Sequence, residues 1–220
     1  MHFTRYPAML VAVFLASTAV AIPAATLPVL DQQGNALKDA VILVEGVPQR
    51  PPLSSSMDQI DLQFQPRVLV VPAGTDVGFP NGDNVRHHVY SFSPTKAFEL
   101  RLFHGSEAPP VTFEQAGPVV LGCNIHDAMI GYILVTDRPW YGLSNPQGIL
   151  DLEHLPPGES VVSWWHPTLG DAPPVTLGSI DLHASDSLTL AVDGMAEAVV
   201  EKPLSPLQKR FNKAAGKYAN

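Results

Sequence analysis

Short runs of apolar residues, separated by turn residues, fill the middle of the chain. Apolar side chains alternate with polar ones at Ile60, Leu62 and Phe64 and again at Val68 and Val70, which is the period of a β-strand. Similar runs recur at a spacing of roughly ten residues, which is typical of an antiparallel sandwich or barrel. The other strands expected in this series are 27–30, 40–45, 77–79, 87–92, 98–103, 111–114, 118–123 and 129–136.

A second, smaller set of apolar runs follows a change of pattern near Pro139. These runs cover residues 149–153, 160–166, 174–181 and 187–192. We therefore predict an all-β chain in two parts, a larger one over 26–138 and a smaller β-sandwich over 139–200. Trp164 and Trp165 are expected to pack the core of the second part, and His166 to cap it.

The first residues have the pattern of an export signal. Arg5 precedes an apolar stretch over residues 9–21, which ends in the small-x-small sequence Ala19-Val20-Ala21. The stretch is shorter than the roughly 20 residues that span a bilayer. We predict a signal peptide over residues 1–21 and a periplasmic mature protein; the alternative is an uncleaved N-terminal anchor.

The last twenty residues form a basic tail. Residues 201–220 hold five Lys and Arg side chains against one acid, Glu201. Ser205 and Gln208 have the spacing of a capping box, with a proline at the first helical position. We predict a short C-terminal helix here.

Composition and charge exclude several classes of protein. The 220 residues include 22 Pro, and a proline inside a helix removes a hydrogen bond, so long helices are not expected. The single cysteine excludes an intrachain disulfide, a Cys-based zinc finger and a Cys-ligated iron–sulfur cluster. The formal net charge of −8 disfavours nucleic acid as a partner and favours a basic protein surface or a cation.

The one cysteine stands in a motif with metal-binding chemistry. Cys123, His126 and Met129 have the spacing C-x-x-H-x-x-M, and Cys123 stands at the end of the expected strand 118–123. Thiolate, imidazole and thioether groups suit copper, and a blue-copper site adds a second histidine. His87 and His88 lie on an upstream strand, and their side chains point to opposite faces, so either one is a candidate. Zinc in a Cys-His₂ site, or a metal-free cluster with a buried cysteine, are the alternatives.

Residues 57–137 resemble the plastocyanin/amicyanin branch of the cupredoxins, on the segments HHVYSFSP and CNIHDAM. The pattern is also similar to bacterial proteins labelled methylamine utilization protein. The resemblance implies a Greek-key β-sandwich with one mononuclear type 1 copper ion. It implies His87, Cys123 and His126 as equatorial ligands and Met129 as the axial ligand.

The sequence departs from the family at three positions. His88 stands where the family has an Asn that braces the ligand loop, so its imidazole either does the same or competes for the metal. Ile125 and Asp127 flank His126 at positions where the family often has Pro. Downstream, the segment 148–167 resembles transthyretin-like or carboxypeptidase regulatory-like sandwiches, which implies scaffolding or interaction.

These features predict a protein that carries single electrons by Cu(II)/Cu(I) cycling and has no substrate chemistry of its own. The expected partner is a redox protein such as a cytochrome c or a dehydrogenase, with neither nucleic acid nor a membrane span in the mature form. One alternative is a copper-binding module for storage, delivery or sensing. Another is a metal-free envelope scaffold.

Overall fold

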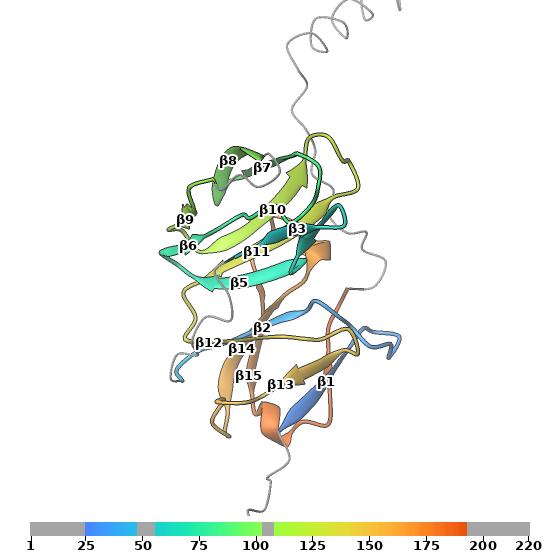
Figure 1. Cartoon of the computed structure of the whole chain (residues 1–220). Coiled ribbons are helices and arrows are strands. Elements are labelled where there is room, and N and C mark those ends of the chain that lie inside the picture. Colours follow the sequence, from blue (N-terminus) through green and yellow to red (C-terminus); the bar gives the residue numbers. More distant parts are fainter. Residues whose placement is uncertain (1–24, 48–55, 103–107, 193–220) are drawn as a thin grey trace, which may run out of the picture.

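Two β-sandwiches are stacked one above the other (Figure 1). The computed structural model describes residues 25–47, 56–102 and 108–192, and these ranges are almost entirely strands, turns and loops. The predicted all-β fold is confirmed. The predicted signal peptide over 1–21 and the predicted helix within 201–220 lie outside the described residues. No helix within the described ranges has the length and hydrophobicity needed to cross a membrane.

The first sandwich contains a five-stranded sheet in the order β5-β11-β10-β7-β8. Strands β5 and β11 are parallel, and the other neighbours are antiparallel. One face of the sheet packs against two strand pairs, β3-β4 and β6-β9, around an apolar core. The bounds are β3 (Asp58–Ile60), β4 (Gln63–Gln65), β5 (Val68–Pro72), β6 (Thr75–Val77), β7 (His87–Ser93), β8 (Lys96–Leu102), β9 (Val111–Phe113), β10 (Gly117–Cys123) and β11 (Ile130–Thr136).

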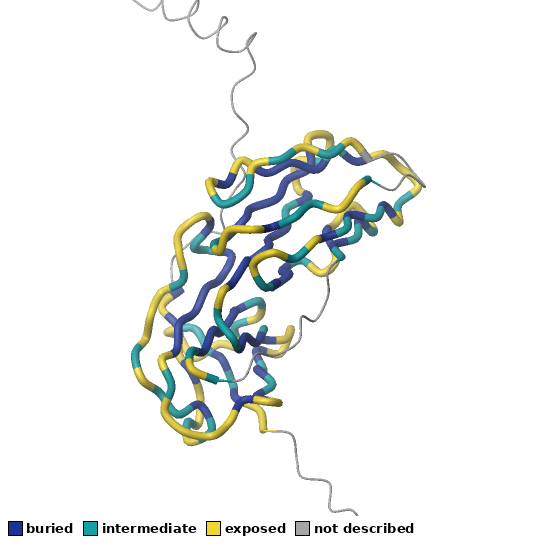
Figure 2. The backbone as a smooth tube through the Cα atoms, turned by 90° about the vertical axis from the view of Figure 1, so that its left-hand side faces the viewer, coloured by how far each residue is buried: buried dark blue, intermediate teal, exposed yellow. Residues whose placement is uncertain are grey.

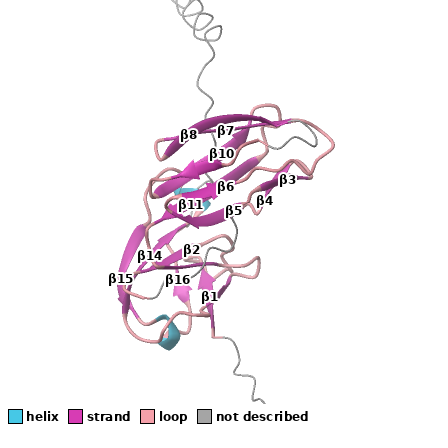
Figure 3. Cartoon of the chain, turned by 60° about the vertical axis from the view of Figure 1, so that its left-hand side comes forward, coloured by secondary structure: helices cyan, strands magenta, loops and turns pink. Residues whose placement is uncertain are grey.

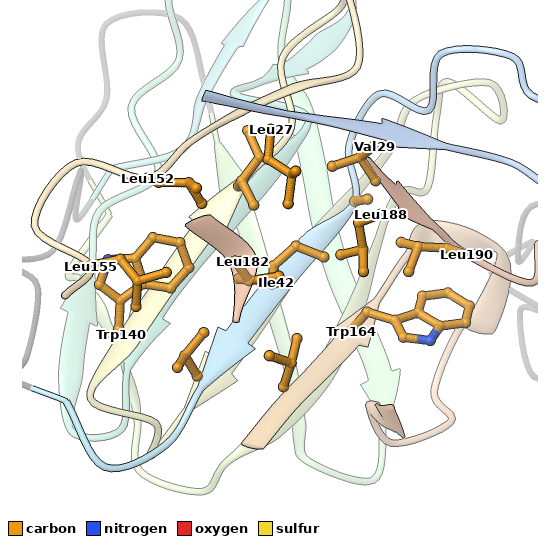
Figure 4. Packing of buried hydrophobic residues seen from close by; sticks show 14 of the residues in the cluster. Leu27, Val29, Ile42, Trp140, Leu152, Leu155, Trp164, Leu182, Leu188 and Leu190 are labelled. Atoms are coloured by element: carbon orange, nitrogen blue, oxygen red, sulfur yellow. The ribbon is translucent and has the colours of Figure 1, made fainter. Parts of the chain in front are cut away.

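The second sandwich packs a four-stranded sheet, β12-β2-β14-β15, against a three-stranded sheet, β13-β1-β16. Figure 4 shows its core, where Trp140 and Trp164 lie among leucine and valine side chains. The bounds are β1 (Thr26–Leu30), β2 (Val41–Val44), β12 (Trp140–Leu143), β13 (Ile149–Asp151), β14 (Ser160–Trp165), β15 (Val175–Ile180) and β16 (Leu188–Thr189), with 3₁₀ turns at Pro167–Leu169 and Leu182–Ala184.

The two sandwiches share an apolar interface, so the molecule is a stack of four layers. The outer face of the five-stranded sheet packs against the four-stranded sheet, with Val70 and Tyr132 on one side and Leu43 and Trp165 on the other. Strand β11 is consequently buried on both faces: Ile133 and Val135 face the first core, while Tyr132 and Leu134 face the interface. Figure 2 shows that buried segments of the backbone run through the middle of the molecule.

The predicted division of the chain is wrong at its N-terminal side. Strands β1 and β2 lie within the range 26–138 but belong to the second sandwich, where β2 pairs with β12 and β14, and β1 pairs with β13 and β16. All four residues of β2 are buried, because its two faces contact different layers. An apolar run that is buried on both faces carries no local signal of its partner strands.

The alternation at Ile60, Leu62 and Phe64 does not continue through one strand. Strands β3 and β4 form a hairpin, and the turn between them consists of Asp61 and Leu62 at φ 54° and 59°. Leu62 is therefore exposed, while Phe64 is buried in the first core. Two residues with positive φ are the signature of the turn that joins tight hairpins, although neither is a glycine here.

Of the two tryptophans expected in the core of the second sandwich, Trp164 lies there and Trp165 does not. Trp164 packs in the core of the second sandwich, whereas Trp165 points to the opposite face of β14 and lies in the interface between the sandwiches. His166 caps the 3₁₀ turn that follows, because its Nδ1 accepts a hydrogen bond from the backbone N–H of Thr168 at 3.2 Å. This hydrogen bond caps a local turn, and the predicted cap over the core of the second sandwich stays a prediction.

Candidate metal centre

Three donor atoms meet at one end of the first sandwich. His87 begins β7, Cys123 ends the antiparallel neighbour β10, and His126 lies on the loop between β10 and β11. The Sγ atom of Cys123 is 3.7 Å from Nδ1 of His87 and 3.6 Å from Nδ1 of His126, and the two Nδ1 atoms are 3.3 Å apart. His87 and Cys123 are buried, and His126 is partly exposed.

These distances fit a small transition-metal ion. Protein ligand bonds to such ions are about 2.0–2.1 Å for nitrogen and about 2.3 Å for sulfur. For angles at the ion between tetrahedral and trigonal-planar, these lengths place the donor atoms roughly 3.3–3.8 Å apart. The observed separations of 3.3, 3.6 and 3.7 Å fall in this range. One thiolate and two imidazoles are also the trigonal donor set of a blue-copper site.

Met129 is buried in the same apolar cluster as Cys123. The ligand loop is closed around it by two backbone hydrogen bonds: Met129 N–H donates to the carbonyl of His126 at 2.9 Å, and Cys123 N–H donates to the carbonyl of Met129 at 3.2 Å. The tight loop therefore holds all three residues of the C-x-x-H-x-x-M motif together. Met57, from the segment before β3, is buried in this cluster as well.

The strand pleat separates the two candidate histidines. The His87 side chain lies on the face that contains Cys123, whereas His88 lies on the other face, with its Nε2 atom 2.6 Å from the Glu99 carboxylate. No group of metal-binding side chains within the described residues includes His88, whereas His87, Cys123 and His126 form such a group. Of the two histidines, the structure thus brings His87 to the cluster.

His88 instead braces the ligand loop. Its Nδ1 is 3.2 Å from Nδ2 of Asn124, and its backbone carbonyl accepts a hydrogen bond from Asn124 N–H at 2.9 Å. An amide Nδ2 can only donate, so Nδ1 of His88 accepts and Nε2–H donates to Glu99. The imidazole thus fills the bracing role that the family's Asn has at this position.

Asp83 orients His87 from the side away from the cysteine. Its Oδ2 lies 2.8 Å from Nε2 of His87, and a carboxylate only accepts, so Nε2 carries the proton and Nδ1 is left free to bind a metal. The backbone amides of Asp61 and Leu62 donate to the same carboxylate at 2.7 and 3.0 Å. The turn of the β3-β4 hairpin is therefore linked through Asp83 to the candidate ligand.

These hydrogen bonds change the acidity of Asp83. Burial by itself raises the pKa of the carboxyl, but hydrogen bonds from the Leu62 amide, the His87 ring and the Asp61 amide outweigh it and hold the pKa below its usual value of 3.8. The sequence marks Asp83 only as part of a turn. The available signal for its contact with His87 is its position four residues earlier in the chain, and this spacing alone does not specify the contact.

The Asp83 carboxylate is expected to make the metal-free protein sensitive to acid. Because its pKa is lower in the folded state, its contribution to stability is fully present above pH ~4 and is lost as the pH falls through the lowered pKa. An Asp83→Asn variant should be less stable at pH 7 and should lose less free energy of unfolding between pH 5 and pH 2. Urea unfolding at several pH values measures both. An unchanged pH dependence would contradict this account.

Metal affinity should respond to Asp83 as well. Loss of a carboxylate that orients a ligand histidine typically lowers metal affinity about 10–100-fold. Asp31→Asn is the matched control, because Asp31 also accepts backbone amides, from Gln33 and Asn35, but it lies in a turn of the second sandwich. Competition titrations with a chelator are expected to show the loss for Asp83→Asn and none for Asp31→Asn.

Solved structures with a similar fold match about two fifths of the chain. A copper-containing nitrite reductase from Thermus scotoductus SA-01 is 30% identical over 40% of this chain and 23% of its own, with a TM-score of 0.36. A purple cupredoxin from Nitrosopumilus maritimus is 23% identical over 38% of this chain and 100% of its own, with a TM-score of 0.34. A reduced amicyanin mutant is 20% identical over 44% of this chain and 99% of its own, with a TM-score of 0.34.

No family model matches the sequence, and no curated protein matches it. The chain spans under a quarter of the nitrite reductase and almost the whole of the two smaller proteins. The first sandwich agrees with the cupredoxin-like fold that the sequence resemblance implies, with His87 and Cys123 on neighbouring antiparallel strands and His126 and Met129 on the loop that follows. His87, Cys123 and His126 are candidate ligands because of the distances between their donor atoms. Met129 is a candidate because it is buried in the same cluster as Cys123.

Proposed function

We propose that this protein is a periplasmic type 1 copper protein that carries single electrons between redox partners. The observation that supports this most directly is the compact triangle of His87 Nδ1, Cys123 Sγ and His126 Nδ1. Met129, buried beside Cys123, is the proposed axial ligand. Copper held there would supply one chemical property, the exchange of a single electron between its Cu(II) and Cu(I) states.

The protein's own residues hold the candidate ligands in position. Cys123 is the last residue of β10, which is hydrogen-bonded to β11 on one side and to β7 on the other, so the sheet fixes the position from which the sulfur projects. Asp83 holds the tautomer and orientation of His87, and the His88–Asn124 contact holds the ligand loop. A rigid ligand set limits the rearrangement that accompanies a change in charge, which favours electron transfer.

His126 is the proposed port for electrons, because it is the candidate ligand that reaches the surface. Exposed apolar side chains lie next to His126, two residues before His87 and in the hairpin turn bonded to Asp83, namely Ile125, Val85 and Leu62, each 44–45% exposed. A small apolar rim suits a transient partner that must dock and leave quickly. A role in methylamine oxidation stays a prediction from the label of similar sequences.

Electrochemistry of the copper-loaded full chain tests this function. An electron carrier is expected to give a reversible one-electron wave and to retain its copper against a chelator in both oxidation states. A protein that binds copper but releases it on reduction would instead favour storage or delivery. A protein with no wave and no bound copper would leave the scaffold alternative.

The rate with a basic partner should depend on salt. The formal net charge of −8 is expected to attract a basic redox protein such as a cytochrome c, and screening weakens this attraction as ionic strength rises. Stopped-flow rates should therefore fall several-fold between roughly 10 mM and 200 mM salt. An uncharged small reductant serves as the control and should react at a constant rate. A cytochrome rate that ignores salt would remove the steering argument.

A further inference from the structure

A small hollow beside the candidate metal centre is lined by positively charged side chains, whereas the chain as a whole is acidic. It has a volume of about 210 Å³ and is lined by Arg86, His87, His88, Arg101 and Ile125. His88 and Arg101 are cross-strand neighbours on β7 and β8, Arg86 precedes β7, and Ile125 belongs to the ligand loop. The hollow thus lies between the outer face of this hairpin and the ligand loop, next to a proposed ligand.

Two arginines in one hollow are unusual in this chain. The described residues contain 17 Asp and Glu side chains but only six Lys and Arg, namely Lys38, Arg67, Arg86, Lys96, Arg101 and Arg138. Arg67 and Arg138 are each held by an ion pair away from the site, with Asp39 and with Glu45. A third of these cations therefore line a single hollow in an otherwise acidic protein.

The two arginines are available to a ligand. In the part of the chain that the structure describes, Arg86 has no ion pair. Arg101 lies 3.6 Å from Glu99, and its side chain is 76% exposed, so the existing contact is long and screened. Glu99 is held more closely by His88, at 2.6 Å from Nε2. The local carboxylate thus leaves much of the positive charge of the hollow uncompensated.

We propose that this hollow binds a carboxylate group that carries a short apolar stem. The guanidinium group presents paired N–H donors that match the two oxygens of a carboxylate, and Arg86 and Arg101 supply two such groups. Ile125, 45% exposed, gives the hollow an apolar wall that an inorganic anion does not use. The volume is below that of pockets for drug-sized ligands, so it admits a small organic acid or the side chain of one Glu or Asp from a partner.

The binding itself does not depend on copper, because the arginines belong to the protein alone. A carboxylate beside His87 would also favour the more positive oxidation state of a bound copper ion and lower its reduction potential. This second effect rests on the proposed function. The two parts are therefore separable by experiment.

Titration of the full chain, without added copper, with propionate tests the site. Backbone and side-chain NMR signals of Arg86, Arg101 and Ile125 are expected to shift and saturate with propionate, and to stay unchanged with propionamide, which has the same shape and no charge. The double variant Arg86→Gln, Arg101→Gln should bind at least about tenfold more weakly. Lys38→Gln, a cation of the second sandwich, is the matched control and should bind as the wild type does.

A second variant guards against indirect effects. Glu99→Gln still accepts a hydrogen bond from His88 but no longer competes for Arg101, so it should bind propionate more tightly than the wild type. Equal shifts with propionate and propionamide, or unchanged affinity in the arginine double variant, would overturn the proposal. The N-acetylated, C-amidated peptides Gly-Glu-Gly and Gly-Gln-Gly, in which only the Glu side chain carries a carboxylate, separate the two sources. Tighter binding of the Glu peptide than of propionate indicates a partner's side chain, and the reverse indicates a free acid.

Discussion

A Cys123→Ser variant is expected to lose the intense visible absorption that one equivalent of Cu(II) produces in the wild type. The band of a type 1 site arises from charge transfer between a thiolate and copper, and Cys123 supplies the one thiol in the chain. Serine keeps the size of the side chain but offers a hard hydroxyl, so any copper that stays bound should give only a weak spectrum. Visible and EPR spectra recorded side by side measure this, with narrow copper hyperfine splitting expected for the wild type alone.

The two adjacent histidines provide the sharpest control for this experiment. His87→Ala removes a donor atom 3.7 Å from Sγ of Cys123 and should also abolish the band. His88→Gln changes a neighbour that faces Glu99 and Asn124, and it should leave a band in place. A colourless wild-type protein, or a band that survives Cys123→Ser, would contradict the type 1 site and leave the zinc or scaffold alternatives.

A Trp165→Ala variant is expected to lower the free energy of unfolding by about 3–5 kcal/mol, the usual cost of deleting a fully buried tryptophan side chain. Trp165 is completely buried in the interface between the two sandwiches. Its ring centre lies 5.8 Å from that of Tyr132 on β11, and its Nε1–H donates to the carbonyl of Gly170 at 3.3 Å. The variant therefore removes packing that both sandwiches share. Chemical denaturation followed by circular dichroism measures the loss.

Trp164→Ala is the matched control, because the neighbouring residue carries the same side chain on the opposite face of β14. Trp164 packs in the core of the second sandwich alone. Hydrogen exchange should show weaker protection of both β11 and β2 in Trp165→Ala, and weaker protection confined to the second sandwich in Trp164→Ala. A loss below about 1 kcal/mol for Trp165→Ala would mean that the two layers are not packed as one unit.

The second sandwich also contacts the strand that ends in Cys123. Strand β10 carries Cys123 at its end, and its Val120 lies in the shared interface. Figure 3 shows β14 and β2 close beneath the five-stranded sheet. The second sandwich therefore covers the rear face of the sheet whose strands carry His87 and Cys123.

The local chemistry of the site could be read from the sequence by itself. Cys123, His126 and Met129 are within seven residues of one another, so their meeting depends only on a tight loop after a strand, and the alternation of apolar residues predicts that strand. The all-β class follows from the same period. These features are short-range, and short-range geometry is set by backbone sterics and side-chain spacing.

Contacts between distant segments were decided by the tertiary structure. His87 rather than His88 faces Cys123, because β7 pairs with β10 in one register and a shift of one residue would exchange the two faces. The same applies to Asp83, which reaches both His87 and the turn at Asp61 and Leu62. Strand β2 joined the second sandwich although its sequence precedes the first. An apolar strand can pair with many others when only its own sequence is considered. The packing of all four layers selects the pairing and register that bury the apolar side chains together.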